Sequence, residues 1–410
     1  MPLDAIREKV DRQLKRGETG VIAAVDTLLR HAVHYRASDI HFEPWSDCLG
    51  LRFRLDGVLH DVATIAKEYQ ERVVARIKVL SKLVVYQKDV PQDGRIDGKG
   101  ENGERAFRVS TFPTVYGEKV VVRLLDAQRE LLVIDSLGFT EEISGRLKDI
   151  VSRPQGVLLL TGPSSSGKTT SIYALLREVM NANGPARHIV TIEDPVEIRL
   201  GRIAQTQVAP HLSFDFDAAM RSLLRQDPDV IMVGEIRDAE TARTAIQAGL
   251  TGHLVISTIH SGTAAGVFSR LLDMGIEPFL ISSSLTGVLA QRLIRKNCTA
   301  CVTAYQPEQR LLTRYGLSLD GDGYRRGAGC PQCRNLGVDG RMAIGELLTV
   351  TDEIRDRVLG RPTTSALHEV AVKSGMKTLL QDGIARAQSG TITMEELSLV
   401  MAPAENGSTR

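Results

Sequence analysis

A phosphate-binding loop is the feature that most limits what this chain can fold into. Residues 158–179 read LLLTGPSSSGKTTSIYALLREV, with an apolar run before the loop and a helix-like stretch after it. The loop matches G-x-x-x-x-G-K-[ST] at every fixed position, through Gly162, Pro163, Ser164, Ser165, Ser166, Gly167, Lys168 and Thr169, with Thr170 following. Glycines let the backbone N–H groups turn towards phosphates, and the helix adds its positive N-terminal end. The segment therefore predicts a strand, a phosphate cradle and a helix in succession.

Two side chains of the loop carry further chemistry. Lys168 is expected to reach the β- and γ-phosphates, and the Thr169 hydroxyl to join the Mg²⁺ shell. A chance match in a glycine-rich turn would occur in about 1–2% of chains of this length. Chance also leaves the preceding strand and the following helix unexplained. We therefore expect binding of a nucleoside triphosphate with Mg²⁺, or descent from a protein that bound one.

From residue 138 onward, apolar strands alternate with amphipathic segments. The apolar runs are GVLLLTG, HIVTIED, DVIMVGE and HLVISTIH. Continuous runs of Val, Ile and Leu indicate strands that are buried on both faces. We expect an α/β fold with a mainly parallel sheet and helices on both of its faces.

The first third of the chain has a different pattern. Alternating segments such as LRFRLDGVL mix with helical ones such as EYQERVVARIKVLSKL, which is typical of a small α+β domain. The expected organisation is a charged N-terminal helix or linker at 1–17, the α+β domain at 18–126, a linker at 127–138, the phosphate-binding α/β domain at 139–401 with a cysteine insert at 296–341, and a flexible tail at 402–410.

Composition argues against several classes of protein. The 51 basic and 50 acidic residues leave a net charge of +1, which gives no bulk electrostatic reason to bind nucleic acid. The charged N-terminus lacks the apolar centre of a signal peptide, and no run of about eighteen apolar residues occurs. We expect a cytoplasmic protein that reaches a membrane through partners.

Acidic side chains end two of the predicted strands. Glu193 and Asp194 close the strand in VTIEDPVEI, and Glu235 closes the one in DVIMVGEIRD. Ligands of a parallel sheet bind beyond the carboxyl ends of its strands, so these acids should lie on the cradle's edge. One of them could hold Mg²⁺ through water while the other polarises the attacking water. The alternative for each acid is that it caps the turn that follows its strand.

Four of the five cysteines form two pairs, Cys298-x₂-Cys301 and Cys330-x₂-Cys333. Paired cysteines in a chain without a secretion signal indicate a metal site rather than disulfides. Four thiolates leave no open coordination position, so the pattern predicts a structural Zn²⁺. The alternative is four unliganded thiols.

Eight segments together resemble the secretion ATPases that drive type II secretion and type IV pilus assembly. They are ASDIHFEP, PQDGRI, RVSTFPTVYGEKVVVRLL, GPSSSGKTT, TIEDPVEI, RQDPDVIMVGEIRD, TGHLVISTIHS and QRLIRKNC. The resemblance runs from Ala37 beyond Cys333. It implies a homohexameric ring of two-domain subunits, with ATP between the N-terminal domain and a RecA-like domain.

The resemblance also implies roles for single residues. TIEDPVEI is similar to the family's aspartate box, with Glu193 as the catalytic acid, and Glu235 is similar to its Walker B carboxylate. His253 and His260 match its histidine box. Arg95 and Arg108 match its N-terminal arginines, and Arg221 and Arg225 its second pair. Since charge builds on the γ-phosphoryl oxygens during transfer, guanidiniums are suited to meet it. The alternative for any single arginine is a solvated surface charge.

The cysteine insert is shared by the assembly relatives and is absent from the retraction relatives. The resemblance thus implies an ATP-hydrolysing motor for pilus or pseudopilus assembly, whose partners are an inner-membrane platform protein and other cytoplasm-facing subunits of the machine. A retraction or DNA-uptake ATPase of the same superfamily is the alternative. The sequence begins almost at the family's second N-terminal domain, so we expect either a short form without the first domain or a piece of a longer protein.

Overall fold

The computed structural model describes residues 4–100, 103–125, 133–183, 186–209, 212, 214–318 and 323–401. The expected tail at 402–410 and residues 127–132 of the expected linker lie outside these ranges. The chain divides into two compact units, Met1–Ala127 and Gln128–Arg410. Each unit has its own main sheet.

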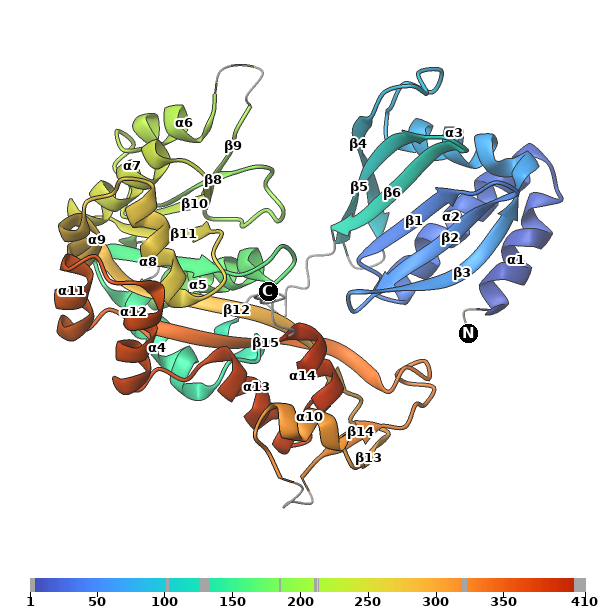
Figure 1. The fold of residues 1–410 in the computed structure, drawn as a ribbon. Helices are drawn as coiled ribbons and strands as arrows, with labels where there is room; N and C mark the ends of the chain where they lie inside the picture. The colour runs from blue at the N-terminus through green and yellow to red at the C-terminus, as the bar shows by residue number, and fades with distance from the viewer. Residues whose placement is uncertain are drawn as a thin grey trace, which may run out of the picture. The chain divides into compact units, whose positions relative to one another are not determined.

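The N-terminal unit is an antiparallel sheet packed against helices (Figure 1). Its strands lie in the order β3-β2-β1-β6-β5-β4. Their bounds are β1 (Asp39–Pro44), β2 (Cys48–Leu55), β3 (Val58–Ala66), β4 (Gln92–Gly100), β5 (Gly103–Thr114) and β6 (Gly117–Leu125). The helices are α1 (Asp4–Leu14), α2 (Glu18–His34), the short η1 (Lys67–Tyr69) and α3 (Gln70–Leu80). On β1, Ile40 and Phe42 are fully buried, whereas His41 and Glu43 point to the opposite face. This is the predicted α+β arrangement.

The second unit is built on a seven-stranded sheet in the order β15-β12-β7-β11-β10-β8-β9. Its strands are β7 (Gly156–Thr161), β8 (Ile189–Glu193), β9 (Ala204–Gln207), β10 (Val230–Ile236), β11 (Leu254–Ile259), β12 (Leu285–Asn297) and β15 (Val338–Thr349). Neighbouring strands are parallel except β15, which runs antiparallel to β12. The predicted, mainly parallel sheet is therefore confirmed.

Helices cover both faces of this sheet (Figure 1). The bounds are η3 (Ile134–Ser136), α4 (Glu141–Ser152), α5 (Lys168–Asn183), α6 (Phe216–Leu223), α7 (Ala239–Leu250), α8 (Ala264–Asp273) and α9 (Pro278–Ser284). Alternate residues of β7 enter two different cores: Leu158 and Leu160 pack with α4 and α5, and Val157 and Leu159 pack with α7 and α8. All four side chains are fully buried, which explains why this strand is apolar at every position.

A small insert lies between β12 and β15, and four helices end the described chain. The insert holds β13 (Val302–Ala304), α10 (Gln309–Arg314) and β14 (Arg325–Gly327). The final helices are α11 (Asp352–Leu359), α12 (Thr364–Lys373), α13 (Leu379–Gln388) and α14 (Met394–Val400). A threonine caps the N-terminus of each of these four helices through its side-chain oxygen. Among the described residues, no helix combines the length and apolarity needed to cross a bilayer.

Candidate functional site

The predicted phosphate cradle joins β7 to α5. The loop leaves β7 at Thr161, and α5 starts at Lys168. Gly162 and Gly167 have φ values of +147° and +88°, which disfavour any residue with a Cβ. A Cβ on Gly162 would also lie only 2.5 Å from the carbonyl oxygen of Gln291 on β12. Both motif glycines are therefore required by the backbone path of the loop.

Lys168 folds back over this loop. Its Nζ atom donates to the carbonyl oxygens of Gly162, 2.8 Å away, and Pro163, 3.0 Å away. Burial lowers the pKa of Lys168; the carboxylate of Glu235 opposes that shift and the guanidinium of Arg292 adds to it. The Lys168 ammonium thus contacts the backbone of the loop and interacts with the charges of Glu235 and Arg292.

The remaining loop residues divide by exposure. Pro163, Ser164 and Ser165 are exposed, and Thr169 and Thr170 are half-buried in the first turn of α5. Ser166 is buried, and its carbonyl accepts a hydrogen bond of 2.8 Å from Nε2 of Gln291. Gln291 is a residue that the sequence reasoning missed, because its contact with the loop depends on the pairing of β12 with β7.

Glu235 and His260 meet at the same edge of the sheet. Glu235 is near the end of β10, and His260 follows β11, the strand between β10 and β7. The Nε2 atom of His260 lies 2.7 Å from Oε1 of Glu235, and Nε of Arg237 lies 2.7 Å from Oε2. Helix α7, which follows β10, is capped by Asp238, and the contacts of the Glu235 carboxylate with described residues are those with His260 and Arg237. The carboxylate is only 18% exposed, whereas the histidine side chain is 59% exposed.

The loop that carries His260 is also fastened to the cradle strand. The hydroxyl of Thr161 donates to the carbonyl of Ser261 and accepts from its N–H, both at 2.9 Å. A displacement of Thr161 at the cradle would therefore also displace Ser261, the residue after His260.

Glu193 is enclosed rather than open to the cradle. It is 2% exposed at the end of β8. One carboxylate oxygen accepts from the hydroxyl of Tyr173, and the other accepts from Thr191 at 2.5 Å and Gln205 at 3.0 Å. Burial and the neighbouring Glu193 raise the pKa of Tyr173, which stays a neutral donor. Asp194, the next residue, is exposed.

The two histidines are not brought together. His253 precedes β11, and its Nδ1 atom lies 3.1 Å from the carbonyl oxygen of Ala248. Leu254 is paired with Gly156 at the start of β7, so His253 lies at the edge of the sheet opposite the cradle. The length of β11, about 20 Å, separates it from the His260 end.

Arg221 and Arg225 make local contacts on and beside α6. Arg221 pairs with Asp217 and with Oε1 of Glu240, the latter at 3.0 Å. Arg225 donates to the carbonyl oxygen of Arg221 at 2.8 Å. Both side chains are exposed, and their contacts with described residues involve no cradle residue.

The N-terminal arginines belong to a row that crosses their sheet. Arg95 on β4 is paired with Arg108 on β5, which is paired with Arg123 on β6. Directly paired residues point to one face, so the three arginine side chains leave the sheet on the same face. The side chains are 50%, 47% and 58% exposed, respectively. Arg123 is a second residue missed from sequence, because only the strand register reveals it.

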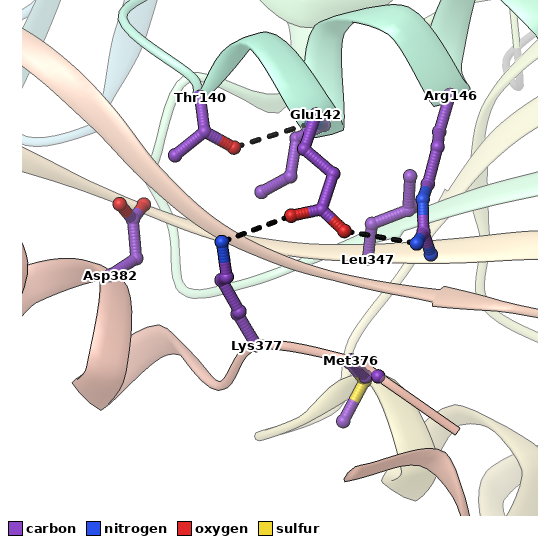
Figure 2. A pocket seen from close by; sticks show the side chains of 9 residues that line it. Thr140, Glu142, Arg146, Leu347, Met376, Lys377 and Asp382 are labelled. Atoms are coloured by element: carbon purple, nitrogen blue, oxygen red, sulfur yellow. Dashed lines mark hydrogen bonds and ion pairs between the residues drawn. The ribbon is translucent and has the colours of Figure 1, made fainter. Parts of the chain in front are cut away.

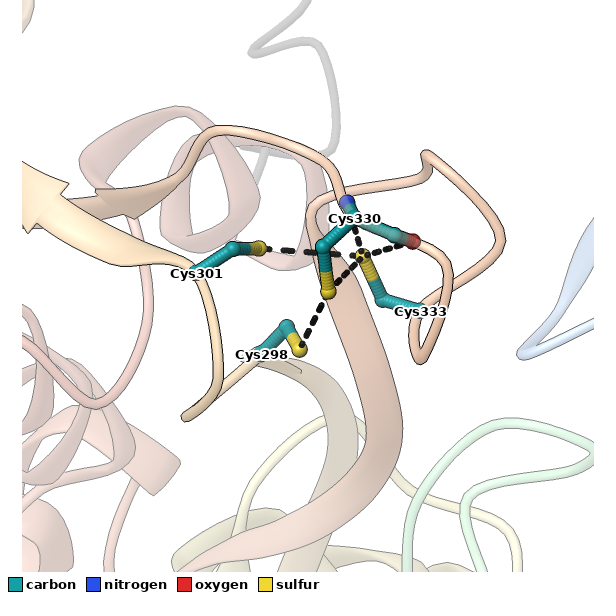
Figure 3. A group of neighbouring side chains, drawn as sticks. All are labelled: Cys298, Cys301, Cys330 and Cys333. Atoms are coloured by element: carbon teal, nitrogen blue, oxygen red, sulfur yellow. Dashed lines mark hydrogen bonds between the residues drawn. The ribbon is translucent and has the colours of Figure 1, made fainter.

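The four paired cysteines converge as predicted (Figure 3). Their Sγ atoms all lie within 4.8 Å of one another. The separations are 3.9 Å for Cys298–Cys330 and 3.7 Å for both Cys301–Cys333 and Cys330–Cys333. A zinc tetrahedron with Zn–S bonds of about 2.3 Å has edges of about 3.8 Å, so the four thiols fit Zn²⁺.

Backbone donors prepare one of these thiols for deprotonation. The N–H groups of Cys330 and Gly337 donate to Sγ of Cys333 at 3.2 and 3.3 Å. Burial by itself raises the pKa of Cys333, but these donors bring it down to about 7. Since thiolates rather than thiols bind zinc, these donors suit Cys333 to a metal site, whereas burial raises the pKa of Cys298 and of Cys301.

A separate small pocket lies between α4 and the C-terminal helices (Figure 2). Its volume of about 20 Å³ is enough for a single water molecule. Glu142 is one of its lining residues and pairs with Arg146 at 2.9 Å and with Lys377 at 3.1 Å. The pocket is too small for a nucleotide, so these ion pairs are best understood as a link between α4 and the chain before α13.

Comparison with known proteins gives consistent matches. The family model described as type II/IV secretion system protein matches residues 15–399. The type II secretion system ATPase E of Vibrio cholerae is 44% identical over 386 residues, which cover 93% of this chain and 75% of that protein. The type IV pilus assembly ATPase PilB of Thermus thermophilus is 42% identical over 393 residues, covering 95% of this chain but only 44% of that protein.

Among solved structures, the ATPase DotB of Legionella pneumophila has a similar fold. Its TM-score is 0.66 at 19% sequence identity, with 92% of this chain and 95% of that chain covered. At this identity the likeness shows the fold alone. It agrees with the RecA-like α/β core that the resemblance implied.

Proposed function

Because this chain belongs to the type II/IV secretion system protein family, we propose that it is an ATP-hydrolysing motor subunit. In this proposal it powers assembly of a type II secretion pseudopilus or a type IV pilus. The observation that carries the proposal is the convergence of three groups at one sheet edge: the cradle, Lys168, and the pair formed by Glu235 and His260.

The cradle residues fit ATP with Mg²⁺. The Thr169 hydroxyl is half-buried in the first turn of α5 and makes no hydrogen bond to another described residue, so it is available as an oxygen ligand. When bound, Mg²⁺ would neutralise charge on the β- and γ-phosphates. Lys168 would exchange its two carbonyl partners for phosphate oxygens, which are the stronger acceptors.

Glu235 is the better placed of the two candidate acids to polarise the attacking water. Its charge raises the pKa of Lys168 through space, and His260 and Arg237 hold both of its oxygens. Glu193 is satisfied by three neutral donors and buried. We assign Glu193 a positioning role at the end of β8, whereas the family resemblance alone would make it the catalytic acid.

The exposed arginines supply positive charge to the γ-phosphoryl group in the assembled ring. Arg95 and Arg108 would do so from the N-terminal unit, and Arg221 and Arg225 from α6. Support comes from their motif positions and from guanidiniums that are not fully committed to local partners. The ring is a homohexamer in this proposal, and His253 acts in coupling between elements rather than on the nucleotide.

Assembly is favoured over retraction by the four-cysteine cluster. We propose that Cys298, Cys301, Cys330 and Cys333 bind a structural Zn²⁺ that holds the insert. The motor would work at the cytoplasmic face of the inner membrane by pushing a platform protein, and no nucleic acid takes part. The near-neutral charge supports that last statement.

The proposal is tested by measuring phosphate release from Mg-ATP with purified protein and no acceptor. We expect release that stops on removal of Mg²⁺ and that double-stranded DNA leaves unchanged. Dependence on a small-molecule acceptor would identify a kinase instead, and strong stimulation by DNA would identify a nucleic-acid motor. Folded, ring-sized protein that releases no phosphate would overturn the proposal.

A further inference from the structure

A second cation lies at the cradle, outside the motif and the mechanism above. Arg292 follows Gln291 on β12, and its Nη1 atom lies 3.3 Å from the position of a Cβ built on Gly162. Its Nη2 atom donates to the carbonyl of Gly262, 3.2 Å away in the loop after β11. Since β7 lies between β12 and β11, this side chain crosses the point where the chain leaves β7 for the cradle.

Arg292 lacks a counter-anion among the described residues. Its Nη1 atom donates to the carbonyl of Gln291 at 3.1 Å, so both of its hydrogen-bond partners are neutral carbonyls. Burial lowers the pKa of Arg292, and Glu346 opposes this only through space. Arg292 is only half-buried, so water meets part of its charge, but the same site also holds the ammonium of Lys168 and two like charges there repel each other.

A hydroxyl group without a hydrogen-bond partner among the described residues also lies beside Gly162. The Oγ atom of Ser166 is buried without a hydrogen-bond partner in the described chain, and it lies 2.7 Å from the position of that same Cβ on Gly162. The Nζ atom of Lys168 is 2.8 Å from the carbonyl of Gly162. Two cations and an unsatisfied hydroxyl therefore surround one glycine of the loop.

An anion with several oxygens would satisfy these groups together. A guanidinium has five N–H donors, and two carbonyl contacts leave others available for a phosphate oxygen. Charge-assisted hydrogen bonds of this kind are stronger than bonds to neutral carbonyls. Because Arg292 and Lys168 both approach Gly162, Arg292 belongs to the phosphate end of the site.

We propose that Arg292 contacts a phosphate oxygen of the nucleotide held by the cradle of its own chain. This inference rests on the proposed function, because it requires that the cradle binds ATP. The competing explanation is a purely structural link, which we call the strut: Arg292 on β12 would only hold the loop after β11, through its bonds to the carbonyls of Gln291 and Gly262.

The test is the affinity for Mg-ATP, measured by calorimetry at several salt concentrations. Arg292→Gln should bind ATP roughly tenfold to hundredfold more weakly than the wild type. Its affinity should also depend less on salt, since one screened charge contact is gone. Lys296→Gln is the matched control, because Lys296 is an exposed cation on the same strand, and it should bind like the wild type.

Arg292→Lys covers the case in which the glutamine variant fails to fold. It keeps the charge but has one nitrogen where Arg292 has two terminal ones, so its affinity should fall less than that of Arg292→Gln and its salt dependence should remain. If either Arg292 variant folds and binds ATP as tightly as the wild type, the inference is wrong. Weaker binding with an unchanged salt dependence in Arg292→Gln would identify the strut. A wild type that binds no ATP would instead defeat the proposed function itself.

Discussion

At the scale of single residues, the path of the loop was readable from the sequence, whereas the surroundings of the two acids were not. The glycine motif is local, and each of its glycines is explained by its own φ value and neighbours. Glu193 and Glu235 look alike in sequence, because both close an apolar strand. They differ in what surrounds them: Tyr173 comes from α5 and encloses Glu193, a contact that no local pattern encodes.

This difference predicts opposite effects for two isosteric variants. Glu193→Gln should lower the free energy of unfolding by about 1–3 kcal/mol, because a buried acceptor of three hydrogen bonds gains an amide donor. Glu235→Gln should leave the melting temperature almost unchanged but abolish most phosphate release. Thermal denaturation and phosphate release, measured on both variants, check this. A Glu193→Gln protein with normal stability and no activity would restore Glu193 as the catalytic acid.

At the scale of elements, strands were predicted well where every position is apolar. The stretch PFLISSSLTGVLAQRLI carries no turn signal where the short helix α9 passes into the long strand β12, so this boundary is not visible in the sequence. The pairing of β12 with β7 places Gln291 and Arg292 at the cradle, and only tertiary structure reveals such a pairing. Arg123 was missed for the same reason, since it joins Arg95 and Arg108 through strand register.

Glu346 on β15 connects two helices of the second unit. Its Oε1 atom accepts from the N–H of Ala264 at 2.8 Å, at the start of α8, and its Oε2 atom accepts from the N–H of Leu379 at 3.2 Å, at the start of α13. It is 2% exposed. A buried carboxylate between two helix N-termini is favourable for both helices.

Glu346→Gln should therefore destabilise the protein by about 2 kcal/mol, since one amide group cannot accept equally from both helices. Chemical denaturation measures the effect. Glu369→Gln on α12 is the control, because Glu369 is exposed and the same change of charge should cost almost nothing there. Equal stabilities for the two variants would show that the carboxylate contributes nothing to helix capping.

The insert gives a second prediction at this scale. Asn297, beside the first cysteine pair, donates to the carbonyls of Arg325 and Gly390, and Tyr305 donates to Glu395 on α14. Removing zinc should therefore loosen α14 as well as the insert. Purified protein should contain one zinc per chain, and Cys330→Ser should lose it together with protection of α14 against amide hydrogen exchange. Metal-free protein with α14 fully protected would contradict this.

At the scale of the whole molecule, the sequence predicted an α+β part and a parallel α/β part, and the chain has both. The function is divided between them in the proposed motor. The cradle belongs to the second unit, and the arginine row belongs to the first. Sequence motifs indicated Arg95 and Arg108 one at a time, whereas the register shows a continuous row that ends at Arg123.

If the row acts on the γ-phosphoryl group, Arg95→Ala and Arg108→Ala should each reduce turnover at least tenfold while weakening ATP binding much less. Turnover and binding are measured separately for each variant. Arg72→Ala on α3, which removes an exposed charge from the same unit, should change neither. Equal losses of binding and turnover would rule out a role confined to the transition state.

The central claim is that the backbone of residues 162–169 grips a triphosphate. Calorimetric titration of folded wild-type protein with Mg-ATP tests it most directly, with Lys168→Ala as the comparison. The account predicts saturable binding to the wild type and at least tenfold weaker binding to the variant. Wild-type protein that is folded and takes up no nucleotide would contradict it.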